Sequence, residues 1–147
     1  MTPIGLVLRA AAERDPGALA IVDGTTRLTY AEWNARVNRA ASALATLGLR
    51  RGDRAVVLMR NREETATVWA AFQKLGAVYA PMNFRLTPSE VETCATLLRP
   101  SLLVFEERTQ DLAGAVLTGL GAGVRAIYVG DGPGPAGAFG FETLLAG

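Results

Sequence analysis

The sequence predicts an α/β fold, a doubly wound and mainly parallel sheet with helices on both faces and a small N-terminal hairpin. Four runs of apolar residues are strand-length and almost unbroken, as in strands buried on both faces of a parallel sheet; they cover residues 55–59, 78–82, 102–105 and 126–129. Helical segments alternate with these runs through short connections, which is the order of a βαβ layer with right-handed crossovers. The first three runs are therefore expected to be parallel neighbours.

The helices that alternate with these runs share one start signal. A capping residue is followed three positions later by Glu, so that each side chain can accept a hydrogen bond from the other's backbone N–H; the pairs are Thr29 with Glu32, Asn61 with Glu64, and Thr87 with Glu90. Pro88 takes the first helical position after Thr87, which suits a residue without an N–H. Gly48 and Gly76 follow the first two helices, as glycine commonly does at a helix end.

Apolar residues recur with helical spacing after Thr87, and they predict one inward face; it contains Val91, Cys94, Ala95 and Leu98. Cys94 is therefore interpreted as an inert core thiol and not as a nucleophile. It is the only cysteine, so the chain forms no internal disulfide, which favours a cytoplasmic protein.

The two ends of the chain depart from the strand–helix alternation. An amphipathic helix is expected over Ile4, Leu8 and Ala11, followed by a hairpin that turns at Asp23 and Gly24. Residues 1–129 are predicted to form one α/β subdomain. Residues 130–147 begin with a Gly/Pro-rich stretch, end in a short turn, and are predicted to be a linker.

Composition excludes several classes of function. The net charge is +1, so nothing indicates a nucleic-acid partner, and arginines such as Arg60 are interpreted as solvated surface. Glu106 is interpreted as a charge that complements a helix start. The absence of histidine excludes Ser-His-Asp and Cys-His catalysis and imidazole-bound zinc within this chain. No membrane span of roughly eighteen apolar residues and no signal-peptide pattern are found.

One glycine pattern imitates a dinucleotide-binding motif. Gly132, Gly134 and Gly137 have the spacing G-x-G-x-x-G and follow a predicted strand. Pro133 and Pro135 remove two of the backbone N–H groups that such a motif offers to phosphate. The pattern is therefore interpreted as part of the linker.

Several short motifs, taken in their order over about residues 20 to 106, carry a resemblance to a known family. They are the helix start LTYAEW, the turn G-L-x-x-G-D into a strand, the pattern N-x-x-E after that strand, the run LGAVYAPMN, and LTPSEV. Together they resemble the amino-terminal part of the adenylate-forming (AMP-binding) acyl-CoA synthetase superfamily. The resemblance implies a subdomain of a larger carboxylic-acid–CoA ligase, for example a fatty-acid–CoA ligase. Such an enzyme uses ATP and Mg²⁺ to form an acyl-adenylate and then transfers the acyl group to CoA.

The same resemblance limits what this chain is expected to do. The family holds ATP with a Ser/Thr/Gly-rich loop that carries a Lys, and the chain has no such loop. The isolated chain is therefore expected to be inactive, with no catalytic residue, no metal site and no cofactor of its own. Residues 130–147 would lead into the missing ATP-binding part. The implied partners are the rest of the parent enzyme, the acid substrate and CoA; a homo-oligomer formed through exposed apolar surface stays open.

Three residues are candidates for binding in the parent enzyme. In acetyl-CoA-forming relatives, arginines just after the strand that matches residues 102–105 touch the nucleotide end of CoA, and Arg108 is the nearest equivalent here. Asn83 and Arg85 would form a wall of the substrate cleft; the alternative is that they only form the strand exit and the turn before the helix cap. The alternative for the whole chain is a stand-alone α/β binding or interaction module derived from this fold.

Overall fold

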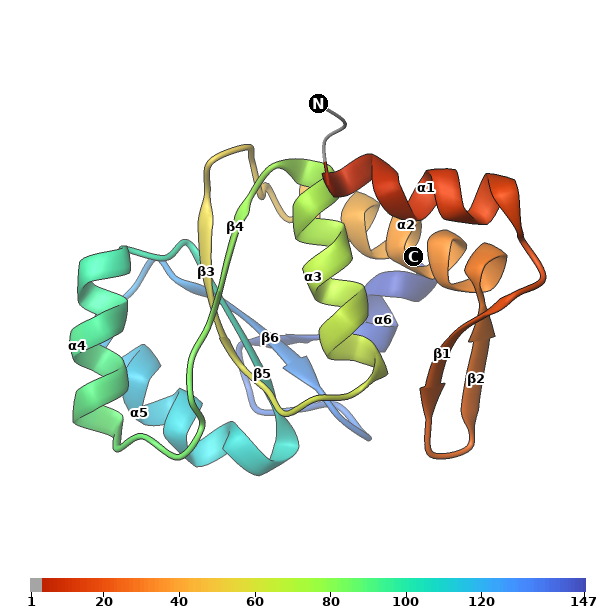
Figure 1. Cartoon of the computed structure of the whole chain (residues 1–147). Coiled ribbons are helices and arrows are strands. Elements are labelled where there is room, and N and C mark those ends of the chain that lie inside the picture. Colours follow the sequence, from red (N-terminus) through yellow and green to blue (C-terminus); the bar gives the residue numbers. More distant parts are fainter. Residues whose placement is uncertain (1–3) are drawn as a thin grey trace. The chain divides into compact units, whose positions relative to one another are not determined.

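The computed structural model describes residues 4–147, and the chain divides into two compact units (Figure 1). The first, here named the helical unit, contains the residues up to Arg51 together with Asn61–Ala77. The second, the sheet unit, contains Gly52–Arg60 and Val78–Gly147. Every strand of the main sheet belongs to the second unit.

The described part of the helical unit combines a hairpin with helices that pack on one another. Its elements are α1 (Ile4–Arg14), β1 (Leu19–Asp23), β2 (Thr26–Thr29), α2 (Tyr30–Thr46) and α3 (Glu63–Leu75). β1 and β2 pair antiparallel, and Gly24 in the turn has a φ of +56°, which glycine adopts without strain. The hairpin predicted at Asp23 and Gly24 is confirmed.

The sheet unit carries a five-stranded parallel sheet in the order β4-β3-β5-β6-β7. Its strands are β3 (Arg54–Leu58), β4 (Val78–Pro81), β5 (Leu102–Glu106), β6 (Arg125–Val129) and β7 (Ala138–Gly140). Its helices are α4 (Pro88–Leu98), the 3₁₀ turn η1 (Glu107–Thr109), α5 (Gln110–Leu120) and α6 (Phe141–Ala146). The predicted parallel sheet is confirmed.

The strand order departs from the prediction in two places. β3 lies between β4 and β5, so the strands that α4 joins are parallel but are not neighbours. β7 lies within the Gly/Pro-rich segment expected to be a linker, and it pairs parallel with β6. A strand of three residues is too short to show an apolar pattern, so only pairing with β6 identifies it.

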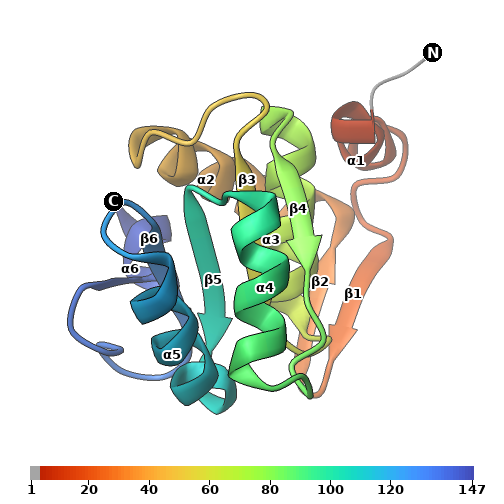
Figure 2. The ribbon, with the colours of Figure 1, turned by 90° about the vertical axis from the view of Figure 1, so that its left-hand side faces the viewer.

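The core of the sheet unit lies between one face of the sheet and the helices α4 and α5 (Figure 2). Buried side chains from three strands meet both helices there; they are Val56, Leu58, Val91, Ala95, Leu103, Phe105, Ala113, Val116, Ala126 and Tyr128. α6 lies on the opposite side of β6 and contacts β6 and β7. Helices therefore flank the sheet on both faces, and the predicted fold class is confirmed.

Cys94 does not belong to this core. The side chain is exposed, whereas Val91 and Ala95 on the same helix are buried and Leu98 is partly buried. At 100° per residue, Cys94 lies at the border of the apolar face of α4. The interpretation as a core thiol is therefore wrong.

Two of the predicted capping boxes are confirmed. The Thr29 hydroxyl accepts from the N–H of Glu32, and the Glu32 carboxylate accepts from the N–H of Thr29 at 2.8 Å. Thr87 and Glu90 make the same reciprocal pair at the start of α4, with Pro88 in its first turn. Both helices thus begin where their local sequence directs them.

The third predicted box, at Asn61 and Glu64, is wrong. α3 begins at Glu63, and Arg62 takes the N-cap position without a side-chain cap. The N–H of Glu63 donates instead to Oδ2 of Asp23 at 2.8 Å. Asp23, at the hairpin turn, therefore accepts from the first turn of α3 in place of the predicted cap Asn61.

Candidate functional site

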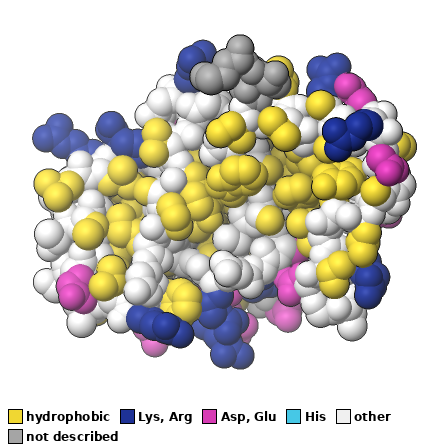
Figure 3. All heavy atoms as spheres, in the orientation of Figure 1, with side chains coloured by type: hydrophobic (Ala, Val, Ile, Leu, Met, Phe, Trp, Pro, Cys, Tyr) yellow, Lys and Arg dark blue, Asp and Glu magenta, His cyan; other side chains and the backbone are white. Residues whose placement is uncertain are grey.

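The strand order places a topological switch point between β3 and β5. From β3 the chain goes first to β4 on one side and later to β5 on the other side. In open parallel sheets, ligands bind outside the carboxyl ends of the strands at such a point. The residues that follow β3, β4 and β5 therefore form the candidate site. Basic side chains lie at the bottom of the view in Figure 3, which is the end where β3, β4 and β5 finish in Figure 1.

A buried carboxylate joins the two strands of the switch point. Glu106, at the end of β5, is 1% exposed and accepts from the backbone N–H of Arg60 at 3.0 Å and from its Nε at 2.9 Å. The Arg60 side chain is 42% exposed, so its guanidinium lies at the surface while its partner is buried. Glu106 also lies at the N-cap of η1, as its interpretation as a charge at a helix start predicts, whereas the interpretation of Arg60 as only solvated surface misses its pairing with this buried carboxylate.

Thr109 strengthens the same junction. Its Oγ1 lies 2.6 Å from the carbonyl oxygen of Leu58, to which it donates, and it accepts from the N–H of Glu106 at 3.1 Å. A buried hydroxyl that both donates and accepts fixes the backbone on each side of it. The carboxyl ends of β3 and β5 are therefore held in one rigid arrangement.

Asn83 and Arg85 lie in the turn that follows β4. Oδ1 of Asn83 accepts from the N–H of Arg85 at 3.0 Å, and the Asn83 carbonyl accepts from the N–H of Leu86 at 3.1 Å. The Arg85 guanidinium lies over the Phe84 ring, 5.6 Å from its centroid. The side-chain oxygen of Asn83 thus has a role in the turn, as the second interpretation expected, while the Arg85 side chain is exposed.

Arg108 lies on η1, at the carboxyl end of β5, and its side chain is exposed. The strand order places β3 between the strand that leads to Arg108 and the strand that leads to Asn83 and Arg85. The fold therefore brings the three predicted residues to one edge of the sheet, on two loops that flank the Arg60–Glu106 pair.

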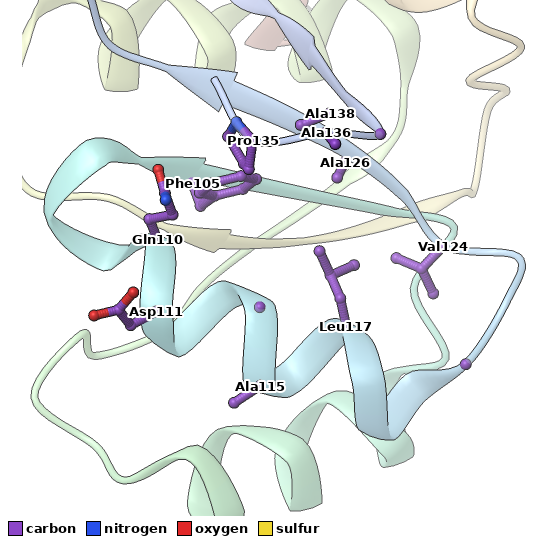
Figure 4. A pocket seen from close by; sticks show the side chains of 13 residues that line it. Phe105, Gln110, Asp111, Ala115, Leu117, Val124, Ala126, Pro135, Ala136 and Ala138 are labelled. Atoms are coloured by element: carbon purple, nitrogen blue, oxygen red, sulfur yellow. The ribbon is translucent and has the colours of Figure 1, made fainter. Parts of the chain in front are cut away.

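A cavity of about 570 Å³ lies between α5 and the connection from β6 to β7, and its lining extends from Gln110 near η1 to Val124 just before β6 (Figure 4). Phe105, Leu117 and Pro135 form apolar walls, and Gln110 contributes a polar group near η1. Gly114 also lines the cavity, and a Cβ placed there would meet no atom within 4 Å. No local sequence pattern marks this cavity, because its walls come from separate elements, namely β5, α5, β6 and the loop that leads to β7.

Two other kinds of site are not seen within residues 4–147. No group of three or more His, Cys, Asp or Glu side chains is placed to hold a metal ion. No helix in this part of the chain has the length and apolar character needed to cross a membrane.

Comparison with known proteins gives a consistent result. Residues 8–137 match the family model described as AMP-binding enzyme. The long-chain-fatty-acid–CoA ligase FadD13 of Mycobacterium tuberculosis (strain ATCC 25618 / H37Rv) is 43% identical over 93 residues, which are 62% of this chain and 18% of that protein. A feruloyl-CoA synthase of Amycolatopsis sp is 34% identical over 108 residues, 74% of this chain and 22% of that protein. The matched segment is thus about a fifth of the length of these relatives.

Solved structures agree with the fold. The anthranilate CoA ligase AuaEII, in complex with anthranoyl-AMP, superposes with a TM-score of 0.91 at 21% identity, over 99% of this chain and 28% of that chain. The N-terminal domain of FACL13 from Mycobacterium tuberculosis superposes with a TM-score of 0.85 at 29% identity, over 99% of this chain and 36% of that chain. With its capping boxes, parallel sheet and switch-point loops, the chain belongs to the family of AMP-binding enzymes and corresponds to an N-terminal portion of them.

Proposed function

We propose that this chain is the N-terminal α/β part of an ATP-dependent carboxylic-acid–CoA ligase, which forms an acyl-adenylate and then a thioester. The observation that carries the proposal is the match of residues 8–137 to the AMP-binding family. The names of the relatives, a fatty-acid–CoA ligase and a feruloyl-CoA synthase, support a carboxylic acid and CoA as the substrates. We place the enzyme in the cytoplasm, in fatty-acid or related acid metabolism.

ATP, Mg²⁺ and CoA are cofactors or substrates of the longer enzyme in this proposal. The chain's single lysine, Lys74, lies within α3 and not in a glycine-rich loop. Catalysis of acyl-adenylate formation depends on preorganised positive groups at the charged oxygens of the phosphates. The 147-residue chain alone should therefore be inactive, and residues 130–147 should lead from the subdomain to the part that binds ATP.

The loops that follow β3, β4 and β5 are proposed to bind the nucleotide end of CoA. Arg108 would contact a phosphate, because its guanidinium is exposed on η1 at the carboxyl end of β5. Asn83 and Arg85 would form a wall of the cleft, where the Asn83 turn holds the backbone of Arg85. The buried Glu106 would keep the β3 loop in place while these exposed residues meet the ligand.

Acid-dependent exchange of labelled pyrophosphate into ATP tests the proposal. The 147-residue chain should give no exchange above a blank, and a version extended beyond Gly147 through the ATP-binding part should give exchange. In the extended protein, Arg108→Ala should raise the KM for CoA about tenfold, because a charge-assisted hydrogen bond is lost. Pyrophosphate exchange should stay unchanged, since CoA takes no part in it. Exchange by the 147-residue chain, or an extended protein without exchange, would contradict the proposal.

One observation favours the alternative, a binding module derived from this fold. The cavity beside α5 has apolar walls formed by Phe105, Leu117 and Pro135, and the exposed Gly114 leaves it open to a small ligand. A screen of small apolar compounds by thermal shift, with Gly114→Leu as the blocked control, distinguishes the two proposals. Tight binding by the 147-residue chain that Gly114→Leu abolishes would favour the module.

A further inference from the structure

A cavity of about 430 Å³ lies in the helical unit, where α1 meets α2 and α3. It is lined by Gly5, Leu6, Arg9, Asn38, Gln73 and Lys74. None of these residues takes part in the site at the sheet edge. We propose that this cavity is an anion site that binds a phosphoryl group, either as free phosphate or as a small phosphate ester.

Lys74 is the centre of the proposed site. Its Nζ donates to Oδ1 of Asn34 at 2.7 Å and to Oδ1 of Asn38 at 2.6 Å. An ammonium group has three N–H donors, so one donor remains for a ligand. The Lys74 side chain is partly buried, and within residues 4–147 no carboxylate pairs with it. A partly buried cation with only neutral acceptors lacks the counter-ion that such groups usually have.

The other polar groups of the cavity are also mainly donors. Arg9 uses its Nε to pair with Glu13 at 2.8 Å, and its terminal nitrogens form no other hydrogen bond with the described residues. The amide nitrogens of Asn38 and Gln73 add neutral donors. Glu13 does not line the cavity. Lys74 has no carboxylate partner among the described residues, and with the outer nitrogens of Arg9 and two side-chain amides it surrounds one space, which favours a ligand that only accepts hydrogen bonds, as a phosphoryl group does.

The electrostatics of Lys74 agree with an anion at this position. Burial lowers the pKa of Lys74, and the positive charge of Arg9 lowers it further. Two like charges that face the same cavity repel each other. A bound phosphate would attract both cations, offset their repulsion and therefore raise the pKa of Lys74.

The cavity is held by close packing at its floor. A Cβ on Gly5 would lie 2.5 Å from the backbone oxygen of Gln73, so α1 and α3 cross at van der Waals contact there. The crossing fixes the backbone that carries Arg9 relative to the backbone that carries Lys74. The space is open at the surface, where Leu6, Arg9 and Asn38 are exposed, so it leaves room for the organic part of a small ester.

The test uses the single lysine of the 147-residue chain. Protein labelled with ¹³C at the lysine ε carbon gives one NMR signal, whose pH titration reports the pKa of Lys74. Inorganic phosphate and glycerol 3-phosphate are titrated separately at constant ionic strength, with chloride as the control anion. A saturable shift and a raised pKa are expected with phosphate or the ester, and tighter binding of one of them identifies whether the free ion or the ester is the ligand. No saturable shift with either probe, or the same shift with chloride, would overturn the proposal.

Matched variants separate a site from general attraction to positive charge. Lys74→Met should weaken binding about tenfold, and Arg9→Met about fivefold, because each removes a charged donor. Arg14→Met removes the same charge from α1 but does not line the cavity, so it should change binding less than twofold. Equal losses in the Arg9 and Arg14 variants would overturn the proposal. If Lys74→Met does not fold, the titration of the wild-type chain with phosphate and chloride still tests whether the site binds a phosphoryl group.

Discussion

Thr87 shows how much one side chain contributes at a helix start. Its hydroxyl accepts from the N–H of Glu90, and the Glu90 carboxylate accepts from the N–H of Thr87 at 2.8 Å. Thr29 does the same at the start of α2. Asn61 has no such role, because α3 begins later and takes its acceptor from Asp23. The same local pattern, a capping residue followed by Glu three positions later, therefore stabilises the helix start at Thr29 and Thr87 but not at Asn61.

Alanine substitutions should reveal this difference. Thr29→Ala and Thr87→Ala should each lower the free energy of unfolding by about 1 kcal/mol, as the loss of a cap does. Asp23→Ala should cost a similar amount, about 1 kcal/mol, because it removes the acceptor at the start of α3. Asn61→Ala is the control and should cost almost nothing. Urea unfolding measures all four, and an Asn61→Ala loss equal to that of Thr87→Ala would contradict the assignment.

The capping boxes also predict a pH dependence. The backbone N–H of Thr87, and then its hydroxyl, donate to Glu90 and lower the pKa of that carboxyl below its ordinary value of 4.5. Because the folded-state pKa is lowered, the stabilisation is fully present above the ordinary value and is lost as the pH falls through the lowered one. Carboxyl ¹³C NMR should show Glu90 titrating nearer 4.5 in Thr87→Ala. Thr29→Ala should leave Glu90 unchanged and shift Glu32 instead.

At the scale of elements, two glycines within helices differ in whether the structure has room for a side chain at their positions. Gly5 of α1 lies at the crossing with α3, where a Cβ would lie 2.5 Å from a backbone oxygen. Gly114 of α5 faces the cavity beside β6, where a Cβ would meet nothing within 4 Å. The first glycine permits helix packing, whereas the second contributes no packing contact and lowers the helix propensity of α5.

Gly5→Ala should therefore lower the free energy of unfolding by about 2 kcal/mol, because the backbone of α3 cannot move aside without loss of packing. Gly114→Ala should raise it by about 0.5–1 kcal/mol, since alanine favours the helix and meets no clash. Thermal and urea unfolding of both variants measure the two signs. A loss of stability in Gly114→Ala would mean that its space is needed by the folded chain itself.

At the scale of the whole molecule, protection is unevenly distributed among the elements. β5 is buried along its whole length and has hydrogen-bonded neighbours on both sides, β3 and β6. β1 and β2 form a separate two-stranded sheet whose residues are mostly exposed or half-buried. Local opening is easier where few apolar side chains are buried and backbone hydrogen bonds are exposed.

Hydrogen exchange followed by mass spectrometry should show this order. Peptides that cover β5 should exchange slowest, those of β3 and β6 nearly as slowly, and those of the β1–β2 hairpin fastest. Asp23→Ala should speed exchange at the start of α3 and leave β5 unchanged, because Asp23 caps only that helix. Uniform exchange over the sheet and the hairpin would contradict this distribution.

Features that depend on near neighbours along the chain could be predicted from the amino-acid sequence. The capping boxes of Thr29 and Thr87 join residues three positions apart, and the strand–helix alternation is written in apolar runs that need no tertiary contact to be seen. The family resemblance followed from such local motifs. It singled out Asn83, Arg85 and Arg108 as candidates for binding, and the strand order then brought them to one end of the sheet.

Features that join residues far apart in the sequence could not be predicted in this way and follow from the packing of the folded chain. Glu106 pairs with Arg60 across 46 positions, and Asp23 caps α3 across 40. β7 forms because it pairs with the free side of β6. Cys94 is exposed because the rotation of α4 against the sheet leaves its side chain outside the buried face. Local propensity cannot fix these outcomes, since strand register and helix rotation depend on what each element packs against.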